Sequence, residues 1–535
     1  MACEGYPDRR VERVTAPRER PVRQILPRDY QNHCSRLVNE PSRQGYFQND
    51  LDWRYFCHFY DYTTNSLTGP IRTNLWSRSI PQAGEVEQWI REMTIALGAL
   101  AMSQLKSSEN SHLHQKQQHK AYAFVKYAKA LQHMQSAICQ RQGDTRQILL
   151  ICVLVFCFEA MQGRQQVACQ NAASGLRAVY EMLAATPSND TSRKTRTRNY
   201  LESIDEDLAC AEACLDAQLV QFIDPRSKLE HRRFLDQLNP VIKTMPQSFE
   251  TIKEAMSFWT AVGRRNAHFV TYACAQMTSL SPPEVVDDDN LTAFRVGDNT
   301  WSSAEPISSR NIPPELFKDH SSHLAEVANF RKASAGVISR EVHQTERDPS
   351  RRQDLIDFYH CFMLRIQMSA SEIHLRSCFN PSQMFFDSTR DLFQDIVQAA
   401  PKILPLLIRN QASNVRQNPF TFHFLVSILP SLAAVTYFCR FQPERDQALA
   451  MLKQIHVEAN DYMEGIWDIK VLYPHAQRMR DLEEEERDPI TGQIPEEKRL
   501  CFADADVNIP ERTVIWRWWQ GVGDGRKLIS YHYEW

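Results

Sequence analysis

Two acidic stretches contain the residues of this chain whose types and spacing could carry out chemistry. One is Asp287-Asp288-Asp289-Asn290-Leu291, and the other is Asn460-Asp461-Tyr-Met-Glu464. Carboxylates grouped in this way can hold Mg²⁺, which neutralises the diphosphate of a substrate. The first stretch lacks an acidic residue at its fifth position and lies in a proline-rich segment, and the second lacks the hydroxyl that a second metal motif needs. A helical isoprenoid-type enzyme is therefore kept as an alternative only.

The histidines and cysteines form no metal-binding pattern. The 17 histidines are scattered, and the closest group, His112, His114 and His119, lies in a polar stretch that predicts a solvated loop. None of the 14 cysteines is part of a C-x-x-C pair. Those inside apolar runs, such as Cys152 and Cys157, are expected to be small buried hydrophobic residues in a reducing compartment.

Other motifs of enzymes and nucleotide-binding proteins are also absent from the sequence. The sequence has no phosphate-binding P-loop, no G-x-S-x-G nucleophile elbow and no H-E-x-x-H zinc helix. The stretch Gly521-Val-Gly-Asp-Gly lacks the third glycine of a dinucleotide loop. We therefore predict no catalytic, cofactor-binding or metal-binding residue, and we expect the protein not to be an enzyme.

Composition limits the fold and the partners. Only 16 of the 535 residues are glycine, about 3% against roughly 7% in a typical chain. This disfavours large β-sandwiches, propellers and glycine-loop nucleotide folds. The 62 basic and 65 acidic residues give a formal net charge of -3. Because proteins that bind nucleic acid with their whole surface are usually basic, DNA contacts would need a local patch or a further segment.

Apolar periodicity predicts a mostly α-helical fold, a large bundle or stacked helical hairpins. Four successive helices are expected between residues 85 and 185, and further helices at 200–222, 248–277 and 322–464. The apolar run Ile148 to Phe158 is too short to cross a membrane, so it predicts a buried helix that ends at Gly163. Two aromatic stretches, Val514 to Gln520 and Lys527 to Trp535, predict a C-terminal β-hairpin.

Composition shifts divide the chain into five segments. Residues 1–45 are expected to be a flexible Arg/Pro-rich arm, 46–279 and 321–480 two helical parts, 280–320 a Pro/Asp-rich loop or insertion, and 481–535 a charged segment with the hairpin. Residues 186–199 form a basic stretch, predicted to be a solvated loop, with a nuclear-localisation signal as the alternative. The acidic run Glu483 to Glu486 predicts a solvated helix end.

Two features resemble the fungal binuclear zinc cluster transcription factors. The first is Cys3-Glu-Gly-Tyr-Pro followed by Arg- and Pro-rich sequence, similar to the end of that family's six-cysteine module and the start of its linker. The second is a succession of motifs similar to the opening of the family's helical regulatory region. Its parts are Ala96-Leu-Gly-Ala-Leu-Ala, the helix Tyr122 to Ile138, and Leu149 to Leu183 with Glu159, Gly163 and Ser174-Gly175-Leu176.

The resemblance implies a nuclear regulator of transcription, one that controls a metabolic or secondary-metabolite gene cluster. It also implies co-regulators or transcription machinery as partners, a homodimer, and no membrane. Only Cys3 could belong to the zinc module, so this chain holds no cofactor, and zinc is expected only if a six-cysteine module lies upstream. DNA binding would then depend on that missing module. The alternative is an accessory regulator that acts through protein partners, and the 5′ end of the transcript would separate the two.

Overall fold

The computed structural model describes residues 46–69, 74–105, 113–140, 145–185, 206–221, 224–277, 293–296, 312–347, 352–380, 382–415, 421–508, 511–521 and 525–535. Several features that the sequence singled out lie outside them: the arm 1–45 with Cys3, His112, the stretch 186–199 and the aspartates Asp287 to Asp289. The chain forms two compact units, residues 1–54 and 55–535. In the described part of the first unit, the ring of Phe47 makes edge contacts with Tyr46 and Trp53.

The fold is mostly α-helical, as the sequence predicted. The helices are α2 (Asp50–His58), α3 (Thr64–Thr68), α4 (Ile80–Val86), α5 (Gln88–Ser103), α6 (Leu113–Gln140), α7 (Thr145–Met161), α8 (Gln165–Ala185), α10 (Glu206–Gln221), α11 (Lys228–Ile242), α12 (Ile252–Met277), α13 (Pro314–Arg347), α14 (Arg352–Ser377), α15 (Arg390–Val415), α16 (Leu429–Phe438), α17 (Gln442–Glu458) and α18 (Ile469–Glu484). None of the described helices is long and apolar enough to span a membrane.

Helices α5 to α8 are the four successive helices expected from the sequence. Helix α7 is buried from Cys152 to Met161, because apolar residues occupy every face of this part. It ends as predicted at Gly163, which has φ 75° and donates its N–H to the Ala160 carbonyl at 2.9 Å. Helix α8 approaches α7 closely, since a Cβ on Gly175 would lie 2.0 Å from the Cys152 sulfur.

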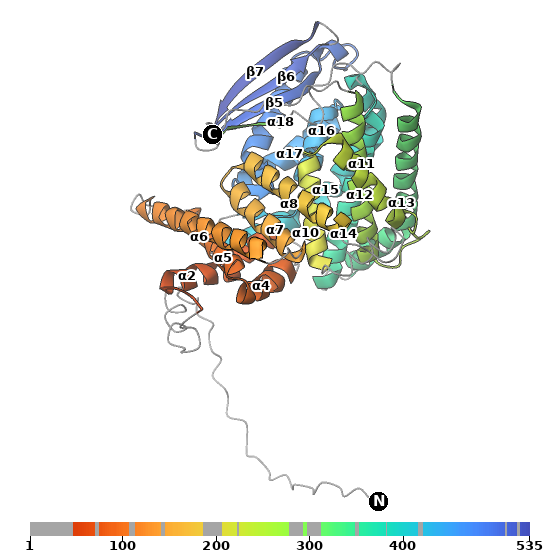
Figure 1. Cartoon of the computed structure of the whole chain (residues 1–535). Coiled ribbons are helices and arrows are strands. Elements are labelled where there is room, and N and C mark those ends of the chain that lie inside the picture. Colours follow the sequence, from red (N-terminus) through yellow and green to blue (C-terminus); the bar gives the residue numbers. More distant parts are fainter. Residues whose placement is uncertain are drawn as a thin grey trace, which may run out of the picture. The chain divides into compact units, whose positions relative to one another are not determined.

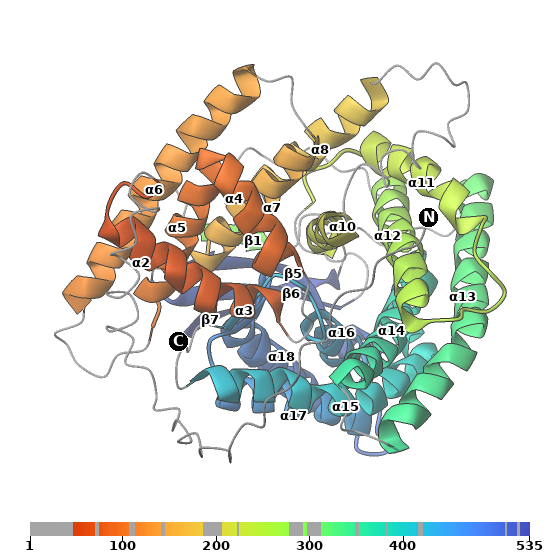
Figure 2. The same ribbon diagram turned by 90° about the horizontal axis from the view of Figure 1, so that it is seen from below.

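Helix α10 is an internal helix of the second unit. It contacts α7, α8 and α12, and Figure 2 shows it end-on between them. Further along the chain, α14 is shared by two hydrophobic cores. Its residues Phe362 and Ile366 pack with α15 to α18, whereas Leu364 and Met368 pack with α11 to α13. The chain thereby folds around α10 and α14 as two internal helices.

A four-stranded antiparallel sheet follows the helices. Its order is β1 (Ala293–Val296), β5 (Leu500–Asn508), β6 (Thr513–Gln520) and β7 (Lys527–Glu534), and the last three strands lie beside α18 in Figure 1. Strands β6 and β7 are the predicted hairpin. Alternation along β6 buries Val514, Trp516 and Trp518 on the inner face. The partners β1 and β5 were not predicted. A second small sheet joins β2 (Thr421–His423), β3 (Tyr462–Glu464) and β4 (Trp467–Asp468).

Further elements differ from the sequence-based expectations. Helix α11 was not predicted, although Ser227 and Glu230 form a capping box that marks its start. Helix α13 begins at Pro314, within the segment expected to be a loop or insertion, and strand β1 lies within the same segment.

The prediction that Glu483 to Glu486 form a solvated helix end is wrong for Glu483. This side chain is fully buried and lies 2.7 Å from both Arg440 Nη2 and Arg445 Nη2. It also accepts the N–H of Leu500 at 2.6 Å, where β5 begins. Burial alone would raise the pKa of Glu483, but the two guanidinium groups hold it below its usual value. Glu485 and Glu486 are exposed, as expected.

Candidate ligand-binding cavity

A cavity of about 520 Å³ lies inside the second unit, a volume within the range typical of small-molecule sites. Its walls come from α10, α12, α14, α16, α18 and strands β5 and β6. The lining is mostly apolar and aromatic, with residues such as Met256, Trp259, Val270, Met363, Phe438 and Leu472.

Helical periodicity brings these residues to the cavity. On α12 the lining positions include 256, 259, 260, 263, 264, 267, 270 and 271, and on α14 they include 359, 360, 363, 367, 370, 371 and 374. Steps of three and four place such positions on one face of each helix. Several are small, including Ala213, Ala217, Gly263, Ala267 and Ala370. Small side chains on facing helices leave the space that larger ones would fill.

Four histidines on the lining are held neutral by burial. Burial lowers the pKa of His360, His374 and His423 to about 4 and that of His475 to about 3. Because a buried imidazolium loses its hydration, the uncharged ring is the stable form near pH 7. These side chains therefore offer hydrogen bonds rather than positive charge.

One of these histidines belongs to a chain of hydrogen bonds. Trp518 on β6 donates its indole N–H to His475 Nε2 at 3.0 Å. The other ring nitrogen, Nδ1, lies 2.6 Å from the Tyr437 hydroxyl oxygen. Burial also raises the pKa of Tyr437, so its hydroxyl keeps its proton. Tyr437 and His475 both line the cavity, while Trp518 is fully buried behind them.

Asp468 is a carboxylate on the lining with a modest set of partners. It is the N-cap residue of α18, and its Oδ1 accepts the N–H of Lys470 at 2.8 Å. Burial raises its pKa to about 6, although the nearby Lys470 opposes the shift. The Lys470 ammonium itself lies 2.6 Å from Asp461.

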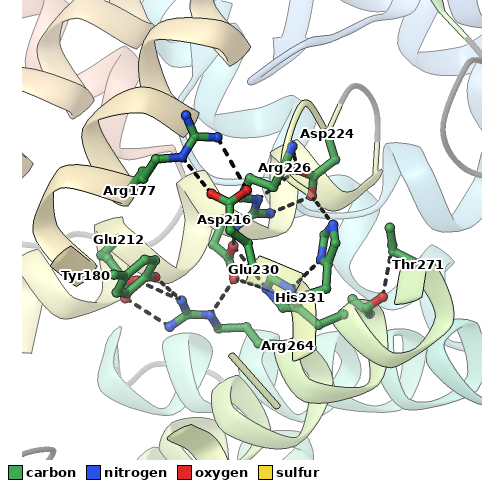
Figure 3. Close-up of polar contacts among 12 residues, drawn as sticks. Arg177, Tyr180, Glu212, Asp216, Asp224, Arg226, Glu230, His231, Arg264 and Thr271 are labelled. Carbon is green, nitrogen blue, oxygen red and sulfur yellow. Dashed lines mark hydrogen bonds and ion pairs between the residues drawn. The ribbon is translucent and has the colours of Figure 1, made fainter. Parts of the chain in front are cut away.

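In contrast to the mostly apolar lining, a network of ion pairs lies in the wall where α10 meets α12 (Figure 3). Its centre is Asp216, which is fully buried and accepts from Arg226, from Arg264 Nε at 2.8 Å and from His268 Nε2 at 3.0 Å. Burial alone would raise the pKa of Asp216, but His268 and the two guanidinium groups hold it well below its usual range.

The arginines of this network each have a second carboxylate. Arg226 also binds Asp224 at 2.6 Å, and Arg264 binds Glu212 at 2.7 Å. The ring of His268 continues to His231, with the two Nδ1 atoms 2.8 Å apart. Asp216 and Arg264 reach the cavity, but their charges are already compensated inside the wall.

Among the candidate metal-binding residues that the structure describes, Asp461 and Glu464 have separate partners. Asp461 pairs with Lys470, whereas Glu464 is buried and accepts from Tyr462 at 2.6 Å and from Ser427. Burial raises the pKa of Glu464, so it forms a hydrogen-bonded core carboxyl. His119 bonds the Tyr55 hydroxyl at 2.8 Å. Among the described residues, no group of three or more His, Cys, Asp or Glu side chains could hold a metal ion.

Other expectations agree with the described residues. Glu159, one of the residues that carry the family resemblance, is buried and accepts from the Tyr127 hydroxyl at 2.7 Å and from Arg164 at 3.1 Å. The described cysteines are free thiols, and Cys152 and Cys157 are buried. Burial raises the pKa of the Cys152 thiol to about 12, which makes it unreactive.

A scan against protein-family models, a search of curated proteins and a search of solved structures each found no match.

Proposed function

We propose that this chain is the ligand-responsive regulatory region of a nuclear transcription regulator of the fungal zinc cluster type. The cavity is the observation that supports this proposal most directly. A mostly apolar space with a few placed polar groups suits the binding of a small molecule. The sequence resemblance at residues 3–10 and about 90–185 supports the assignment to transcription.

In this proposal the protein performs no catalysis. A small molecule enters the cavity and favours one arrangement of the helices around it, because a ligand stabilises whichever state it binds more tightly. That shift changes how the regulatory region engages co-regulators, a second copy, or an N-terminal DNA-binding module. The gene targets would belong to a metabolic or secondary-metabolite pathway.

A reporter assay with the full chain tests this function. The chain is fused to a heterologous DNA-binding module, and transcription from a matching promoter is measured in fungal cells. We expect the fusion to change transcription severalfold relative to the module alone. A folded fusion that leaves transcription unchanged would contradict the proposal.

Two matched substitutions connect the assay to the cavity. Ala434→Phe places a ring in the cavity from α16, whereas Ala450→Phe adds the same ring at an exposed position of α17. We expect Ala434→Phe to lock the reporter in one state and Ala450→Phe to behave as the unmodified chain. If the two variants gave the same reporter response, the cavity would not be the site that controls transcription.

A further inference from the structure

The hydrogen bonds from Trp518 through His475 to Tyr437 run in only one direction. An indole nitrogen can donate but never accept, so His475 Nε2 must be the acceptor of the 3.0 Å bond. A neutral imidazole then carries its single proton on Nδ1. That N–H donates to the Tyr437 oxygen at 2.6 Å.

This direction determines what Tyr437 can offer to the cavity. Its oxygen already accepts from His475, so its own O–H proton is left to donate. Among the described residues, none accepts that proton. Because Tyr437 lines the cavity, the acceptor can be supplied by a bound molecule.

We propose that the cavity binds a neutral, hydrophobic ligand that presents an acceptor oxygen, such as the carbonyl of a ketone, ester or lactone, to the Tyr437 hydroxyl. This inference rests on the proposed function, because it takes the cavity to be the ligand site. It adds the chemical class of the ligand and the residue that recognises it.

The charges around the cavity favour a neutral ligand over an anion. Arg264, the guanidinium on the lining, is already bound to Glu212 and Asp216. Asp468 caps the start of α18, seven residues before His475, a rise of about 10 Å along the helix. Its carboxylate on the same wall would repel a ligand anion, and an unpaired charge in an apolar site is costly.

Three naphthalene probes of nearly equal shape test the proposal by calorimetry. They are 2-acetylnaphthalene, 2-ethylnaphthalene and 2-naphthoate, which differ in whether the side group offers a neutral acceptor, no acceptor or an anion. We expect the ketone to bind the full chain about fivefold more tightly than the ethyl compound, the usual worth of one hydrogen bond. We expect the carboxylate to bind more weakly than the ketone.

Tyr437→Phe removes the donor and keeps the ring. In this variant we expect the ketone and the ethyl compound to bind equally, with the affinity of the ethyl compound unchanged. Tyr462→Phe is the control, because that hydroxyl donates to Glu464 in the core and not to the cavity. A fivefold preference that persists in Tyr437→Phe would overturn the proposal.

Trp518→Phe tests the direction of the hydrogen bonds with Tyr437 left in place. Without the indole N–H, the His475 proton can move to Nε2, and Nδ1 then accepts from Tyr437. We expect the preference for the ketone to fall toward one, an effect that packing alone would not produce. An undiminished preference for the ketone in a folded Trp518→Phe protein would contradict the proposed direction of the hydrogen bonds from Trp518 through His475 to Tyr437.

The results separate this inference from the proposed function. If the ketone and the ethyl compound bind equally to the unmodified chain, or if the carboxylate binds most tightly, the ligand class is wrong although the cavity binds small molecules. If no probe binds, and Ala434→Phe leaves the reporter unchanged, the cavity is not the regulatory site.

Discussion

Two buried ion clusters differ in their ratio of carboxylates to arginines. The Asp216 cluster, where α10 meets α12, combines three carboxylates, Glu212, Asp216 and Asp224, with two arginines and two histidines. The Glu483 cluster, where α16, α17, α18 and β5 meet, combines one carboxylate with Arg440 and Arg445. The first borders the cavity and the second does not.

The difference concerns what each cluster loses when one member changes. In the Asp216 cluster each arginine has two carboxylate partners, so the loss of one partner leaves another. In the Glu483 cluster a single carboxylate compensates two fully buried guanidinium groups and also binds the first N–H of β5. We therefore expect the Glu483 cluster to hold the helices and the sheet together, and the Asp216 cluster to tolerate adjustment beside the cavity.

Glu483→Gln should produce the largest effect. Removing the one charge that compensates two buried guanidinium groups should cost about 3–5 kcal/mol of the free energy of unfolding. Denaturant unfolding of the full chain measures this loss. Glu485→Gln, two residues further on and exposed, is the control and should change stability by less than about 0.5 kcal/mol. Similar effects of the two substitutions would show that the buried cluster contributes little.

Asp216→Asn should have a smaller effect. Arg226 keeps Asp224 and Arg264 keeps Glu212, so we expect a loss of about 1–3 kcal/mol in the same unfolding experiment. Asp319→Asn, which breaks a half-exposed pair with Arg232, serves as the control and should cost less than about 1 kcal/mol. If Asp216→Asn destabilises the protein more than Glu483→Gln, the proposed order of the two clusters is reversed.

Mild acid should affect the Asp216 cluster and spare the Glu483 cluster. Burial lowers the pKa of His231 from 6.5 to about 4. As pH falls below 6.5, the unfolded chain binds a proton that the folded chain refuses, so stability is lost progressively until about pH 4. His231 should account for about 1 kcal/mol of this loss at pH 5.5. By contrast, Glu483 has a lowered pKa, so its contribution is present above the ordinary value of 4.5 and is lost only at lower pH.

Unfolding at pH 7.0 and 5.5 in the unmodified chain and in His231→Asn measures this contribution. The variant should show a smaller difference between the two pH values, whatever its stability at pH 7.0. An unchanged difference would mean that His231 is protonated freely in the folded protein.

Arg177→Gln should have the smallest effect. Arg177 binds Glu230 at 2.6 Å beside the Asp216 cluster, but its side chain is 44% exposed. Exposed ion pairs contribute about 0–1 kcal/mol, so the free energy of unfolding should change by less than about 0.5 kcal/mol. A loss of stability as large as that of Asp216→Asn would mean that the exposed Arg177–Glu230 pair acts as part of the Asp216 cluster.

Local patterns predicted many of the helices but not the cavity. The run Ile148 to Phe158 and the stop at Gly163 can be recognised from neighbouring residues alone, and so can the aromatic alternation of β6 and β7. The capping box at Ser227 was an available local signal for α11. The lining of the cavity shows helical spacing in each element, but the same spacing marks an ordinary packed face.

Long-range partners explain what the sequence could not predict. Glu483 belongs to an acidic run whose other members are exposed, and only its contacts with Arg440 and Arg445 make it a core residue. Similarly, His475 acquires its direction from Trp518 on a strand later in the chain. Such roles depend on which elements meet, and short-range periodicity does not contain that information.

The walls of the cavity are synthesised at different times, because the sheet residues come late in the chain. Leu500, Phe502 and Trp516 line the cavity, and they are synthesised roughly 200 residues after α12. At 5–20 residues per second, about 10–40 s pass on the ribosome between these two walls. The Asp216 cluster can assemble during this interval, but the Glu483 cluster must wait for Leu500. A nascent chain therefore exposes one side of its cavity until β5 and β6 have been synthesised, and a small molecule or a chaperone could reach that side then.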